Sequence, residues 1–174
     1  MTVDLSYPIG RFEPNAQWTA GSRAEAIGVI AGLPATLRRA VSGLDEARLD
    51  TPYRPGGWTV RQVVHHLADS HIAGFIRMKR VLTLENPAIQ PDDQEAWATL
   101  PDNALPIEPS LAIVDGVAQR WTALCRTLGD RELARVYTHA ERGPMTLETH
   151  LHFFAWHARH HTAQITALRD RQGW

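Results

Sequence analysis

The chain has 174 residues, of which 44% are hydrophobic and 21% charged, and its formal net charge is -1. These values are typical of one soluble globular domain, here residues 1–174, and give no reason to expect nucleic acid or a membrane as partner. No apolar run approaches the about 20 residues that span a bilayer, the N-terminus has no signal-peptide pattern, and the single cysteine cannot form an internal disulfide, so we expect a reduced, cytoplasmic location.

Residues 1–17 contain two prolines and little periodicity, which predicts an extended arm on the surface, anchored by Tyr7, Ile9 and Phe12. From about Thr19 to Ser42, apolar residues follow the three-four spacing of a helix. Pro34 lies within this pattern. Because proline lacks an N–H group and clashes with the preceding turn, we expect a kink or break there.

A loop rich in proline and glycine covers residues 50–57. Thr59 and Gln62 then have the spacing of a capping box, and a long helix is predicted from there to about Thr83. Residues 86–109 contain five prolines and are expected to be mostly loop, with a short helix within 92–100. A long ordered loop in a compact domain often has a function, for instance as a lid.

Ser110 is a favourable N-cap for an amphipathic helix that ends at Gly129. Residues 135–145 are the only plausible β segment, and we expect a brief excursion and no sheet. Thr146 caps a last helix that runs to about Arg171. Four long helices without convincing strands predict an all-α protein, a four-helix bundle.

Eight of the nine histidines lie in two short segments, residues 65–71 and 150–161. His157 and His161 are four residues apart, so both side chains can face one ion from the same side of a helix. A third histidine from a facing helix would complete three ligands and leave an open position for water or substrate. Imidazole nitrogens can bind Zn, Ni, Co, Fe or Cu, so these ligands alone do not identify the metal.

The first segment offers two choices for the third ligand. The helical wheel slightly favours His66, with His65 left open, and Asp69 is spaced to accept a hydrogen bond from either ring. A lone histidine on an amphipathic helix is more often an ordinary solvated or hydrogen-bonded residue. We place His71, His139, His152 and His160 in that class and leave His150 unassigned.

Three motifs resemble the YfiT family of the DinB-like superfamily: residues 7–12, residues 50–71 and residues 155–163. This resemblance implies a four-helix bundle with one divalent metal, Zn or Ni, on His66, His157 and His161. It also implies a cytoplasmic homodimer described as a metal-dependent hydrolase. Many close relatives carry a histidine where this chain has Gln164, so no role for a fourth histidine is carried over.

These observations leave three hypotheses about function. In the first, the metal activates a water for hydrolysis of a small substrate, in a cleft beneath the 86–109 loop, with Asp69, His65 and His160 as candidates for orienting ligands or carrying protons. In the second, the metal binds a low-molecular-weight thiol such as bacillithiol, mycothiol or glutathione, as in some relatives that are thiol S-transferases. In the third, the chain is a structural or interaction bundle with incidental histidines.

Overall fold

The computed structural model describes residues 4–14 and 17–174. The parts of the predicted arm at 1–3 and 15–16 lie outside the described residues. The elements in chain order are α1 (Ala20–Val41), α2 (Glu46–Leu49), α3 (Val60–Thr83), β1 (Ala88–Ile89), α4 (Gln94–Trp97), the 3-10 turn η1 (Pro101–Ala104), α5 (Glu108–Cys125), α6 (Asp130–Leu133), β2 (Val136–His139), β3 (Gly143–Thr146) and α7 (Leu147–Gln172).

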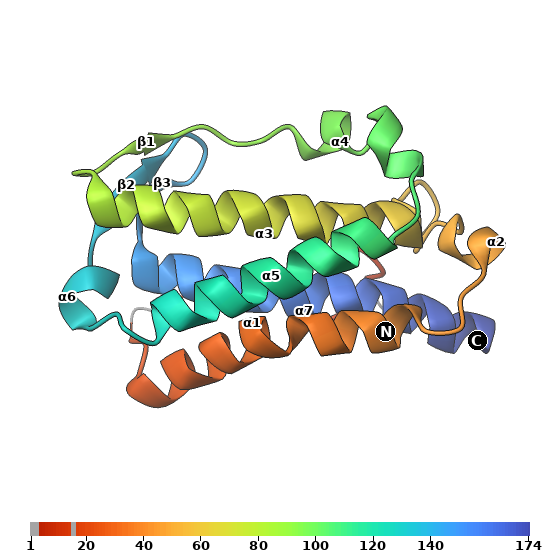
Figure 1. The fold of residues 1–174 in the computed structure, drawn as a ribbon, viewed down its shortest axis with the longest axis horizontal. Coiled ribbons are helices and arrows are strands. Elements are labelled where there is room, and N and C mark those ends of the chain that lie inside the picture. Colours follow the sequence, from red (N-terminus) through yellow and green to blue (C-terminus); the bar gives the residue numbers. More distant parts are fainter. Residues whose placement is uncertain (1–3, 15–16) are drawn as a thin grey trace.

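The four long helices α1, α3, α5 and α7 form a bundle, which confirms the predicted fold class (Figure 1). Helix α1 packs against α5 and α7, and α3 packs against the same two helices. Helices α1 and α7 run in one direction, and α3 and α5 run in the other. In the described part of the chain, no helix is long and apolar enough to cross a membrane.

Because α3 and α5 run parallel, the segment between them must return along the whole bundle (Figure 1). This crossing connection, residues 84–107, contains β1, α4 and η1. Three side chains near the start of α3 hold it in place. Trp58 Nε1 donates to Glu95, Gln62 Nε2 donates to the Ala98 carbonyl, and Arg61 donates to the Leu105 carbonyl.

The crossing connection also supplies an unpredicted strand. β2 and β3 form an antiparallel hairpin, with Val136 opposite Thr146, and β1 pairs in parallel with β2. The order β1-β2-β3 makes a small three-stranded sheet, so the prediction of no sheet was wrong. Strand β1 is only two residues long, so the sequence cannot show an alternating pattern there. It becomes a strand by pairing with the distant strand β2.

Two of the predicted N-caps are confirmed. Thr59 and Gln62 form the capping box of α3, and Thr146 accepts a hydrogen bond from Thr149 N at the start of α7. Ser110, however, does not cap α5, because the helix begins at Glu108 and the Ser110 hydroxyl contacts His65. Of the predicted kink or break at Pro34, the break is absent, since α1 continues as one helix from Ala20 to Val41 with Pro34 inside it.

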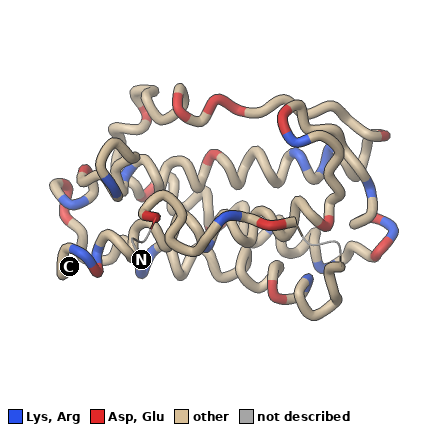
Figure 2. The backbone as a smooth tube through the Cα atoms, turned by 180° about the vertical axis from the view of Figure 1, so that it is seen from behind, with Lys and Arg blue, Asp and Glu red and all other residues tan. Residues whose placement is uncertain are grey.

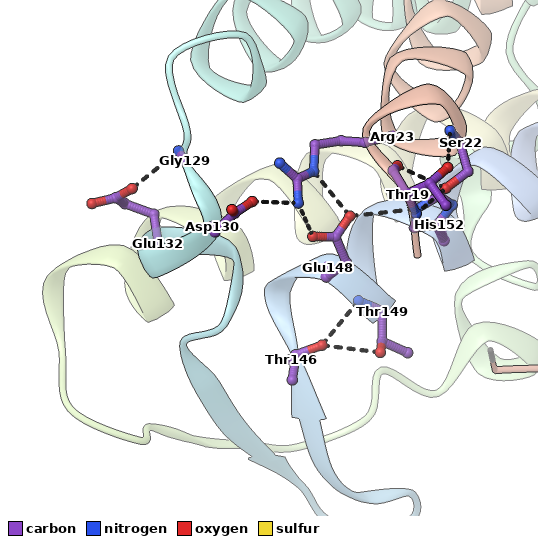
Figure 3. Close-up of polar contacts among 10 residues, drawn as sticks. All are labelled: Thr19, Ser22, Arg23, Gly129, Asp130, Glu132, Thr146, Glu148, Thr149 and His152. Carbon is purple, nitrogen blue, oxygen red and sulfur yellow. Dashed lines mark hydrogen bonds and ion pairs between the residues drawn. The ribbon is translucent and has the colours of Figure 1, made fainter. Parts of the chain in front are cut away.

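An ion-pair network joins the starts of α1 and α7 at one end of the bundle (Figure 3). Arg23 from α1 donates two hydrogen bonds to Glu148 of α7, at 3.1 and 2.7 Å, and also pairs with Asp130. Glu148 lies 3.5 Å from His152, one turn further along α7. His152 in turn stacks on Trp18 with ring centroids 3.7 Å apart. His152 is therefore part of this structural contact.

Two clusters of buried apolar residues fill the bundle, one toward each end. The first includes Val64, Leu67 and Ile165, and the second includes Phe75 and Phe154. On both α3 and α7, the two clusters are separated by a short stretch that carries buried histidines.

Candidate metal centre

The three histidines predicted to share an ion lie together where the two apolar clusters meet. His66 Nε2 of α3 is 3.1 Å from His157 Nε2 of α7, and His161 Nε2 is 3.1 Å from the same atom. One ligand nitrogen from each residue lies within 4.8 Å of the other two. The four-residue spacing on α7 places His157 and His161 on one face, and the packing of α3 against α7 brings in His66.

His65 is turned away from this group. Its Nδ1 lies 2.7 Å from the Ser110 hydroxyl, and its Nε2 lies 3.2 Å from the Leu105 carbonyl. One ring nitrogen therefore ties α3 to the start of α5, and the other ties it to the end of the crossing connection. Of the two residues that the helical wheel left open, His66 is directed toward the α7 pair and His65 is not.

All three imidazoles are in their neutral form near pH 7. Burial lowers the pKa of His66 to about 4, and it lowers the pKa of His157 and of His161 well below the usual value, with the neighbouring histidines adding to the effect. Metal coordination requires neutral imidazole with an available lone pair. The site therefore presents its histidines in the protonation state that a metal needs.

The donor set fits a transition metal better than it fits hydrogen bonding among the rings. One hydrogen on His157 Nε2 can be donated well to only one of its two neighbours at 3.1 Å. A metal ion instead accepts the lone pairs of all three nitrogens. Two nitrogens on a tetrahedral zinc ion, with Zn–N bonds of about 2.0–2.1 Å, lie about 3.3 Å apart. Two of the three spacings in the structure, at 3.1 Å, are close to that value, and the third is within 4.8 Å.

Gln164 is a site residue that the sequence interpretation missed. Its Oε1 lies 2.8 Å from His161 Nδ1, and its Nε2 lies 3.1 Å from His160 Nε2. An outer partner of this kind orients a ligating imidazole. His160 contacts both Gln164 and the His161 ring, whose centroid lies 4.8 Å from its own, and its ring also stacks on Trp156. The sequence contained a relevant observation, because positions 161 and 164 share one helix face.

The suggested contact between Asp69 and a histidine is not found. Both nitrogens of His65 have other partners, and Asp69 lines a different cleft with Ile72 and Ile76, on the outer side of α3. Burial raises the pKa of the Asp69 carboxyl. Among the described hydrogen bonds none joins Asp69 to His65 or His66, so the expectation that Asp69 orients one of these rings is corrected.

His150 and His71 belong to the core. His150 Nε2 lies 3.0 Å from the Gly74 carbonyl and its Nδ1 lies 3.1 Å from the Tyr137 hydroxyl. The His71 ring packs edge-on against Trp121 and Phe154.

A cleft of about 530 Å³ opens beside His66 and His157. The crossing connection forms one wall, which agrees with the predicted position of the 86–109 loop over the site. The other walls come from α3, α7 and the β2–β3 hairpin, and include Arg77, Tyr137 and Arg142. Figure 2 shows several acidic stretches along the crossing connection. Three acidic residues of this connection, Asp92, Asp93 and Glu95, line the cleft. The cleft is therefore polar and mixed in charge.

A pH dependence of stability follows from the buried histidines. Burial lowers the pKa of His71 and of His150 to about 3. In the unfolded chain a histidine has a pKa of about 6.5, so below that pH the unfolded chain binds protons that the folded chain does not. The free energy of unfolding should fall by up to about 1.4 kcal/mol per pH unit for each such histidine.

Urea unfolding of chelator-treated protein at pH 7.5, 6.5, 5.8 and 5.0 tests this dependence without a metal contribution. We expect the midpoint to begin to fall by pH 6.5, where about half of the histidines of the unfolded chain are protonated, and to fall steeply at the two lower values. A midpoint that stays constant down to pH 5.0 would show that these histidines are not kept neutral by burial.

Comparison with known proteins gives a consistent result. The family model of the DinB superfamily matches residues 30–165. Proteins from Bacillus mycoides strain KBAB4 and Bacillus cereus strain B4264, both named for an inferred metal-dependent hydrolase activity, are 46% identical over 171 residues, covering 98% of this chain and 99% of theirs.

Two solved structures are also similar. YfiT from Bacillus subtilis, described as a probable metal-dependent hydrolase with an unusual four-helix bundle topology, superposes with a TM-score of 0.95 at 46% identity, covering 99% of both chains. A second four-helix bundle protein, TT2238, has a TM-score of 0.58 at 22% identity, covering 87% of this chain and 99% of that one, and supports the fold alone.

Proposed function

The chain belongs to the YfiT family of the DinB superfamily, and on that premise we propose that it is a metal-dependent hydrolase of small substrates. The observation that carries the proposal is the convergence of three neutral imidazoles, from His66, His157 and His161, at the edge of a cleft. These residues would hold one divalent transition metal. When bound, such an ion would supply Lewis acidity and would lower the pKa of water toward neutrality.

The remaining work falls to the residues around the cleft. Gln164 accepts the Nδ1 hydrogen of His161, so that the Nε2 lone pair faces the other two histidines. Phe153 and Phe154 form an apolar part of the wall. Arg77 and Arg142 line the same cleft and can bind acidic groups of a substrate.

Glu95 is the best-placed group to accept a proton from the attacking water. It lines the main cleft together with His66, and it also lines a smaller cleft of about 190 Å³ together with His161. Its Oε2 accepts a hydrogen bond from Trp58 Nε1 at 3.0 Å, and the Trp58 ring contacts His66 with centroids 4.6 Å apart. The carboxylate is thus held close to the three histidines while its Oε1 has no partner among the described hydrogen bonds.

Glu95→Gln should reduce kcat by about 100-fold, the lower end of the range for a general base. The amide keeps an oxygen that can accept the Trp58 hydrogen bond but cannot take up a proton. Steady-state kinetics on a substrate of the wild-type protein measures this loss, and chelator competition should show an unchanged metal affinity. Asp69→Asn is the matched control and should retain wild-type kcat. If Glu95→Gln were as active as Asp69→Asn, another group would be the proton acceptor.

The hydrolase proposal itself is tested by incubating the metal-loaded protein with a panel of small esters and amides, beside a chelator-treated sample. Hydrolysis that needs the metal supports the proposal. Absence of hydrolysis across the panel, with a fully loaded site, would count against it.

One observation favours thiol S-transfer as a second candidate. The main cleft adjoins another of about 610 Å³, and His157, Phe153 and Arg142 line both. A thiol in one cleft and an electrophile in the other would meet beside His157, which suits a reaction of two substrates. Consumption of a low-molecular-weight thiol in the presence of an electrophile, without hydrolysis of esters or amides, would favour this candidate over the hydrolase.

A further inference from the structure

The N-terminal arm lies across the face of the bundle (Figure 2), over the turns of α7 that carry the site. Two of its backbone carbonyls accept hydrogen bonds from α7 side chains. Gln164 Nε2 donates to the Ser6 carbonyl and Trp156 Nε1 donates to the Gly10 carbonyl, both at 3.2 Å. The Phe12 ring packs edge-on against Phe153 with centroids 5.4 Å apart. The arm is thus docked on both sides of the histidine pair.

The Ser6 carbonyl determines which way the Gln164 amide points. A carbonyl oxygen only accepts hydrogen bonds, so the amide nitrogen must face Ser6 and the amide oxygen must face His161. That oxygen requires a hydrogen on His161 Nδ1. In a neutral ring the other nitrogen, Nε2, then carries the lone pair, and it is Nε2 that faces His157.

The opposite amide orientation would give the opposite result. An amide nitrogen facing His161 Nδ1 would donate to it, which places the ring hydrogen on Nε2 and removes the lone pair from the site. The other partner of Gln164 does not prevent this, because His160 can either donate or accept at its Nε2. Gln164 is 3% exposed, and its partners Ser6, His160 and His161 line the cleft of about 190 Å³ beside it. Among the described partners, only the arm discriminates between the two orientations.

We propose that the N-terminal arm is a working part of the metal site. When residues 6–12 are docked, the Ser6 carbonyl fixes the amide of Gln164, and Gln164 holds His161 in the tautomer that can bind a metal. Arm docking and metal affinity are therefore coupled, and by thermodynamic reciprocity the metal also stabilises the docked arm. This inference rests on the proposed metal site, and it adds a device by which anything that displaces the arm weakens metal binding.

The test loosens the arm without changing Gln164 or any of the three histidines. Phe12→Ala removes the main apolar anchor and should raise the Kd for Zn²⁺ by about tenfold, the lower end of the cost of losing an outer partner of a metal ligand. Competition with a chromogenic chelator at fixed pH measures the Kd. Ile9→Ala is the control, because Ile9 is in the same arm but 44% exposed, and its Kd should equal that of the wild type.

The Gln164→Glu background separates this mechanism from a general loosening of the structure. A carboxylate accepts the His161 hydrogen in either orientation, so Phe12→Ala should change the Kd less than twofold in that background. An equal loss in both backgrounds, or no loss in either, would overturn the coupling. If the wild-type protein bound no Zn²⁺ at all, the failure would lie with the proposed function.

Hydrogen exchange provides a second readout that involves no activity. Adding Zn²⁺ should slow exchange in the peptide of residues 4–14 of the wild-type protein, but not in Gln164→Leu. Exchange in the arm that is insensitive to Zn²⁺ in the wild type would contradict the coupling.

Discussion

Replacing His157 by alanine is expected to abolish stoichiometric metal binding. His157 Nε2 lies 3.1 Å from the corresponding nitrogens of both His66 and His161, so its loss removes the central donor and leaves two. Loss of an outer partner alone costs about 10–100-fold in affinity, and loss of a ligand should exceed that. Titration of the metal-free protein with Zn²⁺ measures the effect, and metal-dependent activity should disappear with binding.

His152→Ala is the matched control for this experiment. His152 lies on the same helix and is 8% exposed, against 6% for His157, but its contacts are with Trp18 and Glu148. The control should bind one metal per chain with the wild-type Kd. Equal binding by both variants would mean that the three-histidine assignment is wrong.

Gly74→Ala should lower the free energy of unfolding by about 2–3 kcal/mol, near the upper end of the usual cost of overpacking. A Cβ at this position of α3 would lie 2.6 Å from Cε1 of Phe154 and 2.7 Å from Cη2 of Trp121. Both are buried aromatic rings in the same cluster. The Gly74 carbonyl also accepts the hydrogen bond from His150, so a shift of the backbone would disturb that contact.

A glycine-to-alanine substitution at Gly28 should have the opposite effect on the free energy of unfolding. Gly28 lies in α1 and is exposed, and a Cβ added there would meet no atom of a neighbouring element within 4 Å. Gly28→Ala should raise the free energy of unfolding by about 0.5–1 kcal/mol, because alanine restricts the unfolded chain and favours the helix. Urea unfolding of both variants measures the two changes. A Gly74→Ala protein as stable as Gly28→Ala would show that α3, α5 and α7 pack less closely than the structure indicates.

The parts of the fold that sequence predicted depend on local patterns. Thr59 with Gln62 and Thr146 with Thr149 act within four residues, and the starts of α3 and α7 lie where those patterns placed them. The pairing of His157 with His161 is local in the same sense, since helix periodicity alone places both on one face.

The parts that sequence did not predict depend on distant partners. Ser110 has the chemistry of an N-cap, yet its hydroxyl contacts His65, 45 residues away. Glu95 lies in the short helix α4, too short for a periodic pattern, and its side chain is held by Trp58, 37 residues earlier. The orientation of the Gln164 amide depends on Ser6, 158 residues away. No local pattern can reveal such contacts, and the choice between His65 and His66 is of the same kind.

Anomalous diffraction from crystals of protein purified in chelator-free buffer would test the metal site most directly, because it locates an ion and its ligands together. The expected result is one peak per chain, about 2.0–2.1 Å from Nε2 of His66, His157 and His161. A peak on other residues, or a fully folded protein with no peak after soaking in Zn²⁺, would contradict the assignment of these three histidines as the metal site.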